Sequence, residues 1–425
     1  NADGYRVFSS SGTKSSHKIV ISGVTTTITL DSVIIETTDG KSAIDIDDAS
    51  DVELIVSGEN SLTVNNTVTG AGIHISGGSL TISGTDSDDD VLNVLNASSY
   101  GATIGSNNGE DFTGTITVDS GVTVNAGIDV INLYHEGAGI GSGESGDMSG
   151  TIVINDGSVV NAISKSGGAG IGSGGAGDMN GSIIINGGDV TADGKIAGAG
   201  IGSGVLGSLN GSIQINGGTV NADSSQLGAG IGSGLEGDLN GEIIINDGNV
   251  NVNGAGSGIG IGTGIYGLAN GDIIIHSDAV VTLENDSKIG AYYESTGTIY
   301  LYKGAEINGI TVTDIDELKD AGILNDNMNA EIVEEETGET YSLGKLNNVS
   351  RIKTAKSGDT VYIYESQLSK GKLPYYVLEA LAKTDNVTLI VVSDSGETAE
   401  IKSSSIPEKG KNAFFTVDEL LDMAK

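Results

Sequence analysis

The heptapeptide Gly137-Ala-Gly-Ile-Gly-Ser-Gly143 is repeated without change from Gly168, Gly198 and Gly228, and in a looser form as Gly258-Ile-Gly-Ile-Gly-Thr-Gly264. The central isoleucines of the five copies follow one another at 31 residues once and at 30 residues thereafter: Ile140, Ile171, Ile201, Ile231 and Ile261. A fixed period of this size is typical of stacked units, each of which buries its apolar face on its neighbours. The repeat therefore predicts a solenoid.

Weaker copies of the same pattern extend the period in both directions. Toward the N-terminus, the central isoleucine is matched by Ile104, Ile73 and Ile44. Toward the C-terminus, Lys288-Ile-Gly290 follows the last good copy. The sequence thus predicts eight or nine coils.

Each good coil carries three short strand signals. The heptapeptide is followed by a run such as Gly181-Ser-Ile-Ile-Ile-Asn186, then by a tight turn, then by a run such as Val190-Thr-Ala192. No helical period is present, and the first of the two prolines is Pro374. We therefore predict an all-β fold, a right-handed parallel β-helix over residues 17–310 with about 30 residues per coil. Adjacent coils place equivalent residues side by side, so we expect an amide ladder of Asn155, Asn186, Asn216 and Asn246.

The remaining chain divides into three parts. Residues 1–16 are polar and are expected to form a cap or an arm, and residues 311–345 are expected to form an acidic connector rich in glutamate. Residues 346–425 read as a small α+β module with strands near 360–364 and 387–392 and a helix near 374–383. Thr416-Val-Asp-Glu419 has the pattern of a capping box before a terminal helix.

Alternation along the strands assigns side chains to faces. If the heptapeptide isoleucines point inward, the glycines at alternate positions leave a strip of bare backbone on the outside. We expect this strip, together with an outward aliphatic column, to form an assembly face for the C-terminal module, another copy of the chain or a flat polymer. Its members are Gly139, Gly170, Gly200, Gly230, Ile184, Ile244 and Ile274. One alternative is that a loop or the connector of the same chain covers this face. Another alternative is that the glycines serve turns too tight for any Cβ.

Composition excludes several classes of protein. Acidic residues outnumber basic residues 57 to 20, which gives a net charge of −37 and argues against nucleic acid and anionic membranes as partners. The chain has no cysteine, so it has neither a disulfide framework nor a thiol nucleophile. No apolar run approaches the roughly 18 residues of a membrane span, so no membrane insertion is expected. The chain starts at Asn1, and we expect any signal peptide to have been removed or to lie outside it.

The phased Gly-Ala-Gly-Ile-Gly-Ser-Gly and Asn-Gly-x-Ile-x-Ile-Asn segments resemble the β-helix domains of secreted bacterial surface proteins, often described as carbohydrate-binding-domain-containing proteins. Their helix is similar to that of polysaccharide lyases. The stretch from Ser357 to Val392 resembles small modules of surface proteins from Gram-positive anaerobes. These resemblances imply an extracellular or cell-surface location, and adhesion or binding to a polysaccharide or host glycan, in some members with calcium.

Calcium has two candidate sites. Asp147, Asp178 and Asp238 recur at one position of the coil, where neighbouring carboxylates repel unless a cation bridges them. Oxygen ligands are also dense in an earlier loop, at Asp86, Asp88, Asp89 and Asp90. The alternative is that these aspartates are solvated turn residues.

Aromatic residues gather where the coils end. Tyr293, Tyr300 and Tyr302 are candidates for stacking on sugar rings, and the alternative is that they pack against the C-terminal module. For catalysis, the four histidines are scattered singly, and no facing pair of carboxylates stands out. We therefore predict a non-catalytic adhesin or carbohydrate-binding module. A structural rod or fibre subunit is the first alternative, and a polysaccharide lyase or glycoside hydrolase is the second.

Overall fold

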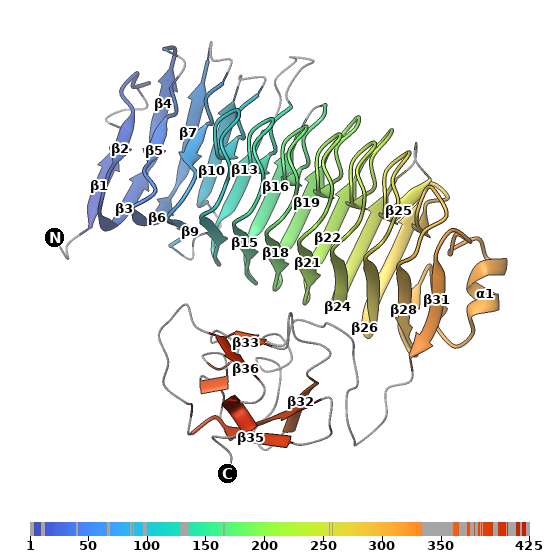
Figure 1. Ribbon diagram of the computed structural model, residues 1–425. Helices are drawn as coiled ribbons and strands as arrows, with labels where there is room; N and C mark the ends of the chain where they lie inside the picture. The colour runs from blue at the N-terminus through green and yellow to red at the C-terminus, as the bar shows by residue number, and fades with distance from the viewer. Residues whose placement is uncertain are drawn as a thin grey trace. The chain divides into compact units, whose positions relative to one another are not determined.

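The computed structural model describes residues 4–333, except 10–12, 40, 66–68, 86, 88, 97–99, 128–135, 165, 255 and 257, and parts of the chain between 360 and 421. The chain separates into two compact units, Asn1–Val333 and Glu334–Lys425. The first unit is a parallel β-solenoid whose coils stack in chain order (Figure 1).

One side of the solenoid is a ten-stranded parallel sheet, here sheet B, with one short strand from each coil. Its strands are β2 (Ile19–Ile21), β5 (Ile44–Ile46), β8 (Ile73–Ile75), β11 (Ile104–Gly105), β14 (Ile140–Gly141), β17 (Ile171–Gly172), β20 (Ile201–Gly202), β23 (Ile231–Gly232), β25 (Ile259–Gly262) and β27 (Lys288–Gly290). The described residues of the first unit form ten coils, where eight or nine were predicted. The additional coil begins at β2, which pairs with β5 but has no glycine-rich segment to reveal it.

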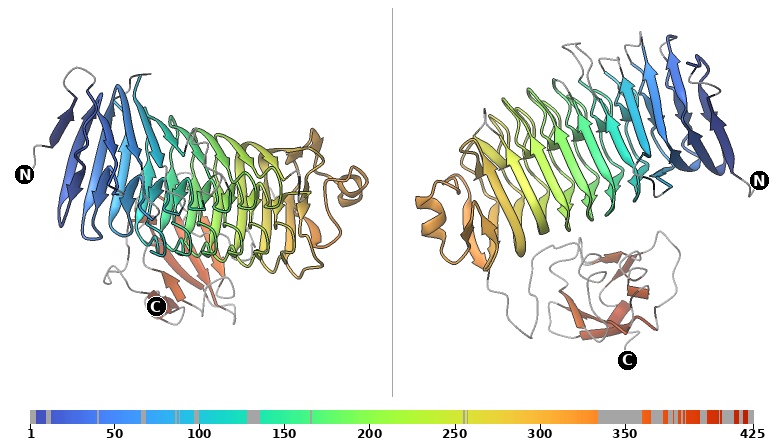
Figure 2. Two further views of the ribbon diagram at one scale, coloured as in Figure 1. Left: turned by 90° about the horizontal axis from the view of Figure 1, so that it is seen from above. Right: turned by 180° about the vertical axis from the view of Figure 1, so that it is seen from behind.

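The rest of each coil contributes to a 21-stranded sheet, here sheet A, in two runs separated by a tight turn (Figure 2). The first run is β1 (Tyr5–Phe8), β3 (Thr25–Asp31), β6 (Asp51–Ser57), β9 (Ser79–Ser83), β12 (Thr115–Val118), β15 (Thr151–Ile154), β18 (Ser182–Ile185), β21 (Ser212–Ile215), β28 (Thr298–Tyr302) and β31 (Asn329–Val333). The second run is β4 (Ile34–Thr37), β7 (Glu59–Val64), β10 (Val91–Asn96), β13 (Thr123–Ala126), β16 (Val159–Ile163), β19 (Asp189–Asp193), β22 (Thr219–Asp223), β29 (Glu306–Ile307) and β30 (Ile310–Thr311). In β24 (Glu242–Asn253) and β26 (Asp272–Glu284) the two runs join into one long strand.

The strands stack in register, which builds columns of equivalent residues. Ile140, Ile171, Ile201 and Ile231 are direct neighbours in sheet B and have no exposed surface, as predicted for an inward column. Ile183, Ile213 and Ile243 form a second inward column in sheet A. The predicted amide ladder is also confirmed, with nitrogen–oxygen distances of 2.9, 2.9 and 2.7 Å from Asn155 to Asn246.

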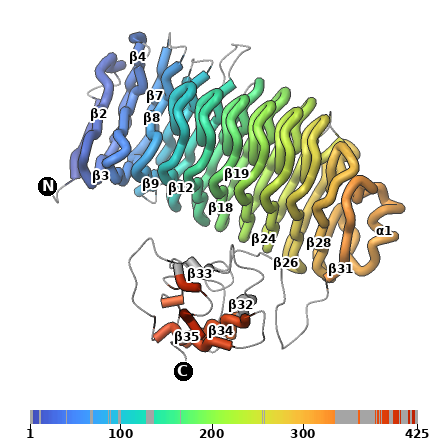
Figure 3. The backbone as a smooth tube through the Cα atoms, in the orientation of Figure 1, coloured from blue at the N-terminus to red at the C-terminus, as the bar shows by residue number. Residues whose placement is uncertain are grey.

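Both ends of the solenoid are closed by short elements. β1 pairs in parallel with β3, so residues 5–8 form a capping strand within the predicted N-terminal cap or arm. At the other end, helix α1 (Ile315–Asp320) begins at Asp314, whose carboxylate accepts a hydrogen bond from the Asp316 amide. β31 then adds to β28. Residues 311–333, predicted as connector, therefore belong to the solenoid unit, and Figure 3 follows this path as a tube.

The second unit contains small sheets around a separate core. β32 (Thr360–Tyr364) pairs in parallel with β34 (Thr388–Val392), which pairs in antiparallel with β35 (Thr398–Lys402). β33 (Lys372–Pro374) pairs with β36 (Phe414–Thr416). The predicted capping box is present, because the Thr416 and Glu419 side chains and backbone amides bond reciprocally. Across the described parts of both units, no helix has the length and apolar character needed to cross a bilayer.

Candidate functional site

The glycine-rich heptapeptide is a closed bend rather than an extended strand. In the copy from Gly198, the Ala199 amide donates to the Ser203 carbonyl at 3.0 Å, which places Ile201 at the inward apex. Gly202 has a φ of +137°, a backbone conformation that side-chain-bearing residues rarely adopt. The Ser203 hydroxyl is buried, donates to the Gly207 carbonyl at 2.6 Å and accepts the Gly234 amide at 3.2 Å. The isoleucine, glycine and serine positions of the repeat therefore each have a structural role in the bend.

The predicted assembly face is wrong, because the glycines of this bend are not on the surface. Gly139, Gly170, Gly200 and Gly230 are buried, and a Cβ there would lie within 2.4–2.6 Å of atoms of the same chain. The alternation rule failed because these glycines pack against strands of sheet A: a Cβ on Gly200 would lie 2.6 Å from the Asp223 amide nitrogen and 2.8 Å from the Ala192 carbonyl oxygen. The alternative, that the glycines serve backbone geometry, accounts for the strip.

The aliphatic column is not an exposed stripe either. Ile244 and Ile274 are 1% and 3% exposed, and Ile184 is half-buried. Ile244 lies in register between Gln214 and Ile274 in this column. An exposed aliphatic patch cannot be built from these positions.

The predicted calcium column forms a ladder of hydrogen bonds. The Asp147 carboxylate accepts from the Asp178 amide at 2.9 Å and from the Asn180 side chain at 3.0 Å. The Asp178 and Asp238 carboxylates accept the amides of Ser208 and Leu268, respectively. Backbone donors therefore offset the repulsion along the column.

In the earlier loop, Asp90 is buried, and its carboxylate accepts the amides of Gly58 at 2.8 Å and Thr85 at 2.6 Å. Asp89 is exposed, whereas Asp86 and Asp88 lie outside the described residues. Within the described residues, no group of three or more histidine, aspartate or glutamate side chains is arranged to hold a metal ion. Calcium binding stays a prediction.

Three tyrosines form a cluster beside the last glycine-rich coil. The Tyr292 and Tyr293 rings meet edge to face with centroids 5.0 Å apart, and Tyr266 lies 5.4 Å from Tyr292 and 6.2 Å from Tyr293. Tyr266 and Tyr293 are 53% and 46% exposed. Two aromatic faces are thus held in place and open to solvent.

Backbone contacts across the coils position this cluster. Tyr266 sits in a turn with a φ of +69°, at the place held by Ser145, Ala176, Leu206 and Glu236 in the other coils. The Tyr293 amide donates to the Gly267 carbonyl at 3.3 Å, and the Tyr292 amide donates to the Thr263 hydroxyl at 2.9 Å. Sequence reasoning found Tyr293 but missed Tyr266, although aligning the repeats would have shown a tyrosine at a turn position.

The other two predicted sugar-stacking residues lie elsewhere. Tyr300 is half-buried on the outer side of sheet A, next to Ile274. Tyr302 is 2% exposed and stacks on His276 with ring centroids 4.1 Å apart. The prediction that Tyr302 offers an open stacking face is wrong, because its ring is already packed.

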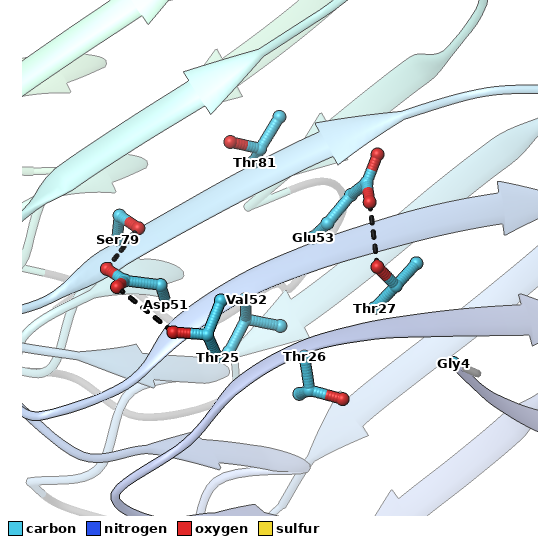
Figure 4. Close-up of a pocket in the computed structure, with 9 residues that line it drawn as sticks. All are labelled: Gly4, Thr25, Thr26, Thr27, Asp51, Val52, Glu53, Ser79 and Thr81. Atoms are coloured by element: carbon cyan, nitrogen blue, oxygen red, sulfur yellow. Dashed lines mark hydrogen bonds between the residues drawn. The ribbon is translucent and has the colours of Figure 1, made fainter. Parts of the chain in front are cut away.

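A polar trough lies on the outer face of the first coils (Figure 4). It encloses 340 Å³ and is lined by residues from β3, β6 and β9, together with Gly4. The Asp51 carboxylate accepts the hydroxyls of Ser79 at 2.7 Å and Thr25 at 3.4 Å, and Glu53 accepts from Thr27 at 2.8 Å. Among its nine lining residues there is no aromatic ring.

His74 joins three coils in an arrangement that its isolated position in the sequence did not reveal. Its ring nitrogens lie 2.8 Å from an Asp45 oxygen and 2.9 Å from a Glu110 oxygen. Burial alone would lower the pKa of His74, but the hydrogen bonds to Glu110 and Asp45 outweigh it and raise the pKa. The same hydrogen bond lowers the pKa of Glu110 to about 2. Both nitrogens are engaged, so the ring links coils as an imidazolium.

Glu136 and Glu144 form the carboxyl pair that the sequence did not single out. The bend brings Glu144 back to the start of its own coil. Burial, followed by the hydrogen bond and repulsion from Glu136, raises the pKa of Glu144 to about 7. Near neutral pH and below, the protonated Glu144 carboxyl can therefore form its hydrogen bond with Glu136.

This pair predicts a pH-dependent stability. Because the pKa of Glu144 is about 7 in the folded chain and 4.5 ordinarily, folding takes up a proton between these values. Its contribution to stability is present below 4.5 and is lost as pH rises through 7. We expect Glu144→Gln to flatten the fall in melting temperature between about pH 5 and pH 8, measured by circular dichroism. Glu236→Gln, an exposed turn residue, is the control. A Glu144→Gln variant with the wild-type pH profile would contradict the pairing.

Comparison with known proteins supports the repeat and its class. A family model described as Beta helix repeat matches residues 152–175, 183–205 and 213–235. Each matched segment runs from the first strand run of one coil to the glycine-rich bend of the next. The fold and this match together define a β-helix repeat protein. No curated protein and no solved structure matches the chain.

Proposed function

We propose that this chain is a non-catalytic carbohydrate-binding protein of the cell exterior and that Tyr266, Tyr292 and Tyr293 bind a polysaccharide. The observation that carries the proposal is the preformed aromatic cluster with two exposed rings. Exposed apolar surface held by a rigid scaffold is typical of interaction sites. The face of a tyrosine ring packs against the apolar face of a sugar, and its hydroxyl remains available for a hydrogen bond.

Two further features support a sugar as the ligand. The cluster lies on a surface of hydroxyl and amide groups, which match the hydrogen-bonding groups of a sugar. The net charge of −37 disfavours polyanions such as nucleic acid. The trough near β3 offers hydroxyls and carboxylates but no stacking face, so the tyrosine cluster is the stronger site.

The proposal is tested by substituting the two exposed rings. We expect Tyr266→Ala and Tyr293→Ala each to weaken binding to the glycans recognised on an array by at least about tenfold, since each removes a stacking face. Their melting temperatures should stay near that of the wild type, because both side chains are about half exposed.

Leu206→Ala is the matched control, because Leu206 occupies the turn position of Tyr266 two coils away and is 57% exposed. It should leave binding unchanged. Repeating the array with EDTA tests the predicted calcium dependence. An array without any bound glycan, or tyrosine variants that bind like the wild type, would contradict the proposal.

A further inference from the structure

A ladder of exposed asparagines runs along the solenoid beside the tyrosine cluster. Its members are Asn180, Asn210, Asn240 and Asn270, one from each of four successive coils, and all four are exposed. From Asn210 onward, each side-chain nitrogen donates to the oxygen of the preceding asparagine at 2.9 Å. The Asn180 nitrogen donates instead to the Asp147 carboxylate at 3.0 Å. Thr296 ends the ladder by donating to Asn270 at 3.2 Å. The amides are therefore held in one orientation at the spacing of the coils.

The ladder does not use all of its hydrogen-bonding capacity. An asparagine amide has two donor hydrogens and two acceptor lone pairs. In the described part of the chain, the nitrogens of Asn240 and Asn270 each make one bond, which leaves a donor on each. The Asn210 nitrogen makes a second bond, to the Asp178 carboxylate at 3.3 Å. Each of the four side-chain oxygens accepts one hydrogen bond, from the next asparagine of the ladder or, for Asn270, from Thr296. Each oxygen therefore retains a lone pair.

Two neighbouring segments, residues 267–270 and 293–296, connect the asparagine ladder to the tyrosine cluster. Gly267 receives the Tyr293 amide, and the Ala269 amide donates to the Ser295 hydroxyl at 2.8 Å. Asn270 and Thr296 follow immediately along the same two segments. The free donors of Asn240 and Asn270 thus lie at the end of the ladder nearest to the aromatic rings.

We propose that the asparagine ladder is an extended set of subsites for an uncharged linear polysaccharide, which lies along the solenoid axis with about one sugar per coil. This inference rests on the proposed function. Coils repeat at about 4.8 Å, which is close to the length of one sugar residue in an extended chain. Each sugar then meets the same amide oxygen, and the tyrosines anchor one end of the polymer.

Negative charge beside the asparagine ladder favours a neutral polysaccharide over an anionic one. The column two residues before the ladder carries Asp147, Asp178 and Asp238, which lie beside any polymer bound to the amides. These carboxylates repel a polymer of uronic acids and tolerate a neutral one. Neutral chains rich in hydroxyl or acetamido groups therefore fit the surface.

The experiment measures affinity as a function of ligand length. Cello-, manno- and N-acetylated chito-oligosaccharides of two to six sugars are titrated by calorimetry, with oligogalacturonates as the anionic comparison. For the neutral series that binds, we expect the wild-type affinity to rise about tenfold or more from the dimer to the hexamer as subsites are added. Oligogalacturonates should bind more weakly at every length.

The double variant Asn240→Ala with Asn270→Ala should lose this rise and keep the affinity for the dimer, which the tyrosines hold. The matched control is Asn216→Ala with Asn246→Ala, which removes two members of the ladder at another corner of the coil and should keep the rise. Circular dichroism melts of both variants show whether a ladder loss alone unfolds the coils.

The outcomes separate the two proposals. A length dependence that survives in the Asn240/Asn270 variant, or is lost equally in the control, overturns the ladder and leaves the tyrosine site standing. A dimer affinity that is unchanged by Tyr293→Ala overturns the tyrosine site. Preferred binding of oligogalacturonates overturns the assignment of a neutral ligand. If no series binds to the wild type, both proposals fall.

Discussion

Replacing Gly202 with alanine is expected to unfold the solenoid or to lower its free energy of unfolding by roughly 3–5 kcal/mol. At a φ of +137°, Gly202 adopts a conformation that an alanine enters only with strain. An added Cβ would also lie 1.8 Å from the Gly232 carbonyl oxygen of the next coil. The neighbouring coil cannot move away, because its own glycine is packed in the same manner against Gly262.

The measurement is urea unfolding followed by circular dichroism, which reports the free energy of unfolding and its slope. Gly217→Ala is the matched control from the same coil, because a Cβ there meets only the Asn186 carbonyl oxygen, at 3.3 Å. It should fold with a small change in stability. A Gly202→Ala variant as stable as the Gly217→Ala variant would show that the bend relaxes more easily than the structure indicates.

The substitution Ile201→Asp should lower the free energy of unfolding by a similarly large amount. Ile201 has no exposed surface and is stacked between Ile171 and Ile231 in the inward column. The substitution removes a buried aliphatic side chain, which costs about 2–5 kcal/mol even for alanine, and adds a carboxylate without a partner. Since each coil is held only by its two neighbours, the damage separates the solenoid into two shorter stacks.

Two control variants test why Ile201→Asp loses stability. Ile201→Val keeps most of the volume and should cost about 0.5–1.5 kcal/mol. Leu206→Asp places the same charge on a 57% exposed side chain of the same coil and should change little. Melting curves of the three variants should therefore rank Leu206→Asp and Ile201→Val close to the wild type and Ile201→Asp far below. An Ile201→Asp variant that melts with the controls would contradict the inward column.

The period of the repeat determined much of the fold without any structure. Because equivalent residues of neighbouring coils stack in register, the spacing from Ile140 to Ile231 was enough to predict an inward column. The same argument predicted the ladder from Asn155 to Asn246. Local patterns were equally informative, since the capping box of Thr416 and Glu419 depends only on residues three apart.

Only the tertiary structure decided how the glycine-rich stretch is used. The alternation argument left one side of each heptapeptide open to solvent, whereas a Cβ on Gly200 would meet backbone atoms of Asp223 in β22 and Ala192 in β19. The assembly face predicted from Gly170 and Gly200 therefore does not exist as a surface. Glycine permits both an open face and a tight bend, and the sequence alone does not say which of them a given glycine serves.

The 30-residue period of the repeat also did not predict the candidate sites. Tyr266 meets Tyr293 at the last glycine-rich coil. His74 meets Glu110 although its in-register partner in that coil is Gly105, whereas its contact with Asp45 follows the register of the strands. A repeat predicts contacts between equivalent positions, since these follow from stacking alone. Contacts between non-equivalent side chains depend on where each turn folds back, and only the three-dimensional path of the chain determines that.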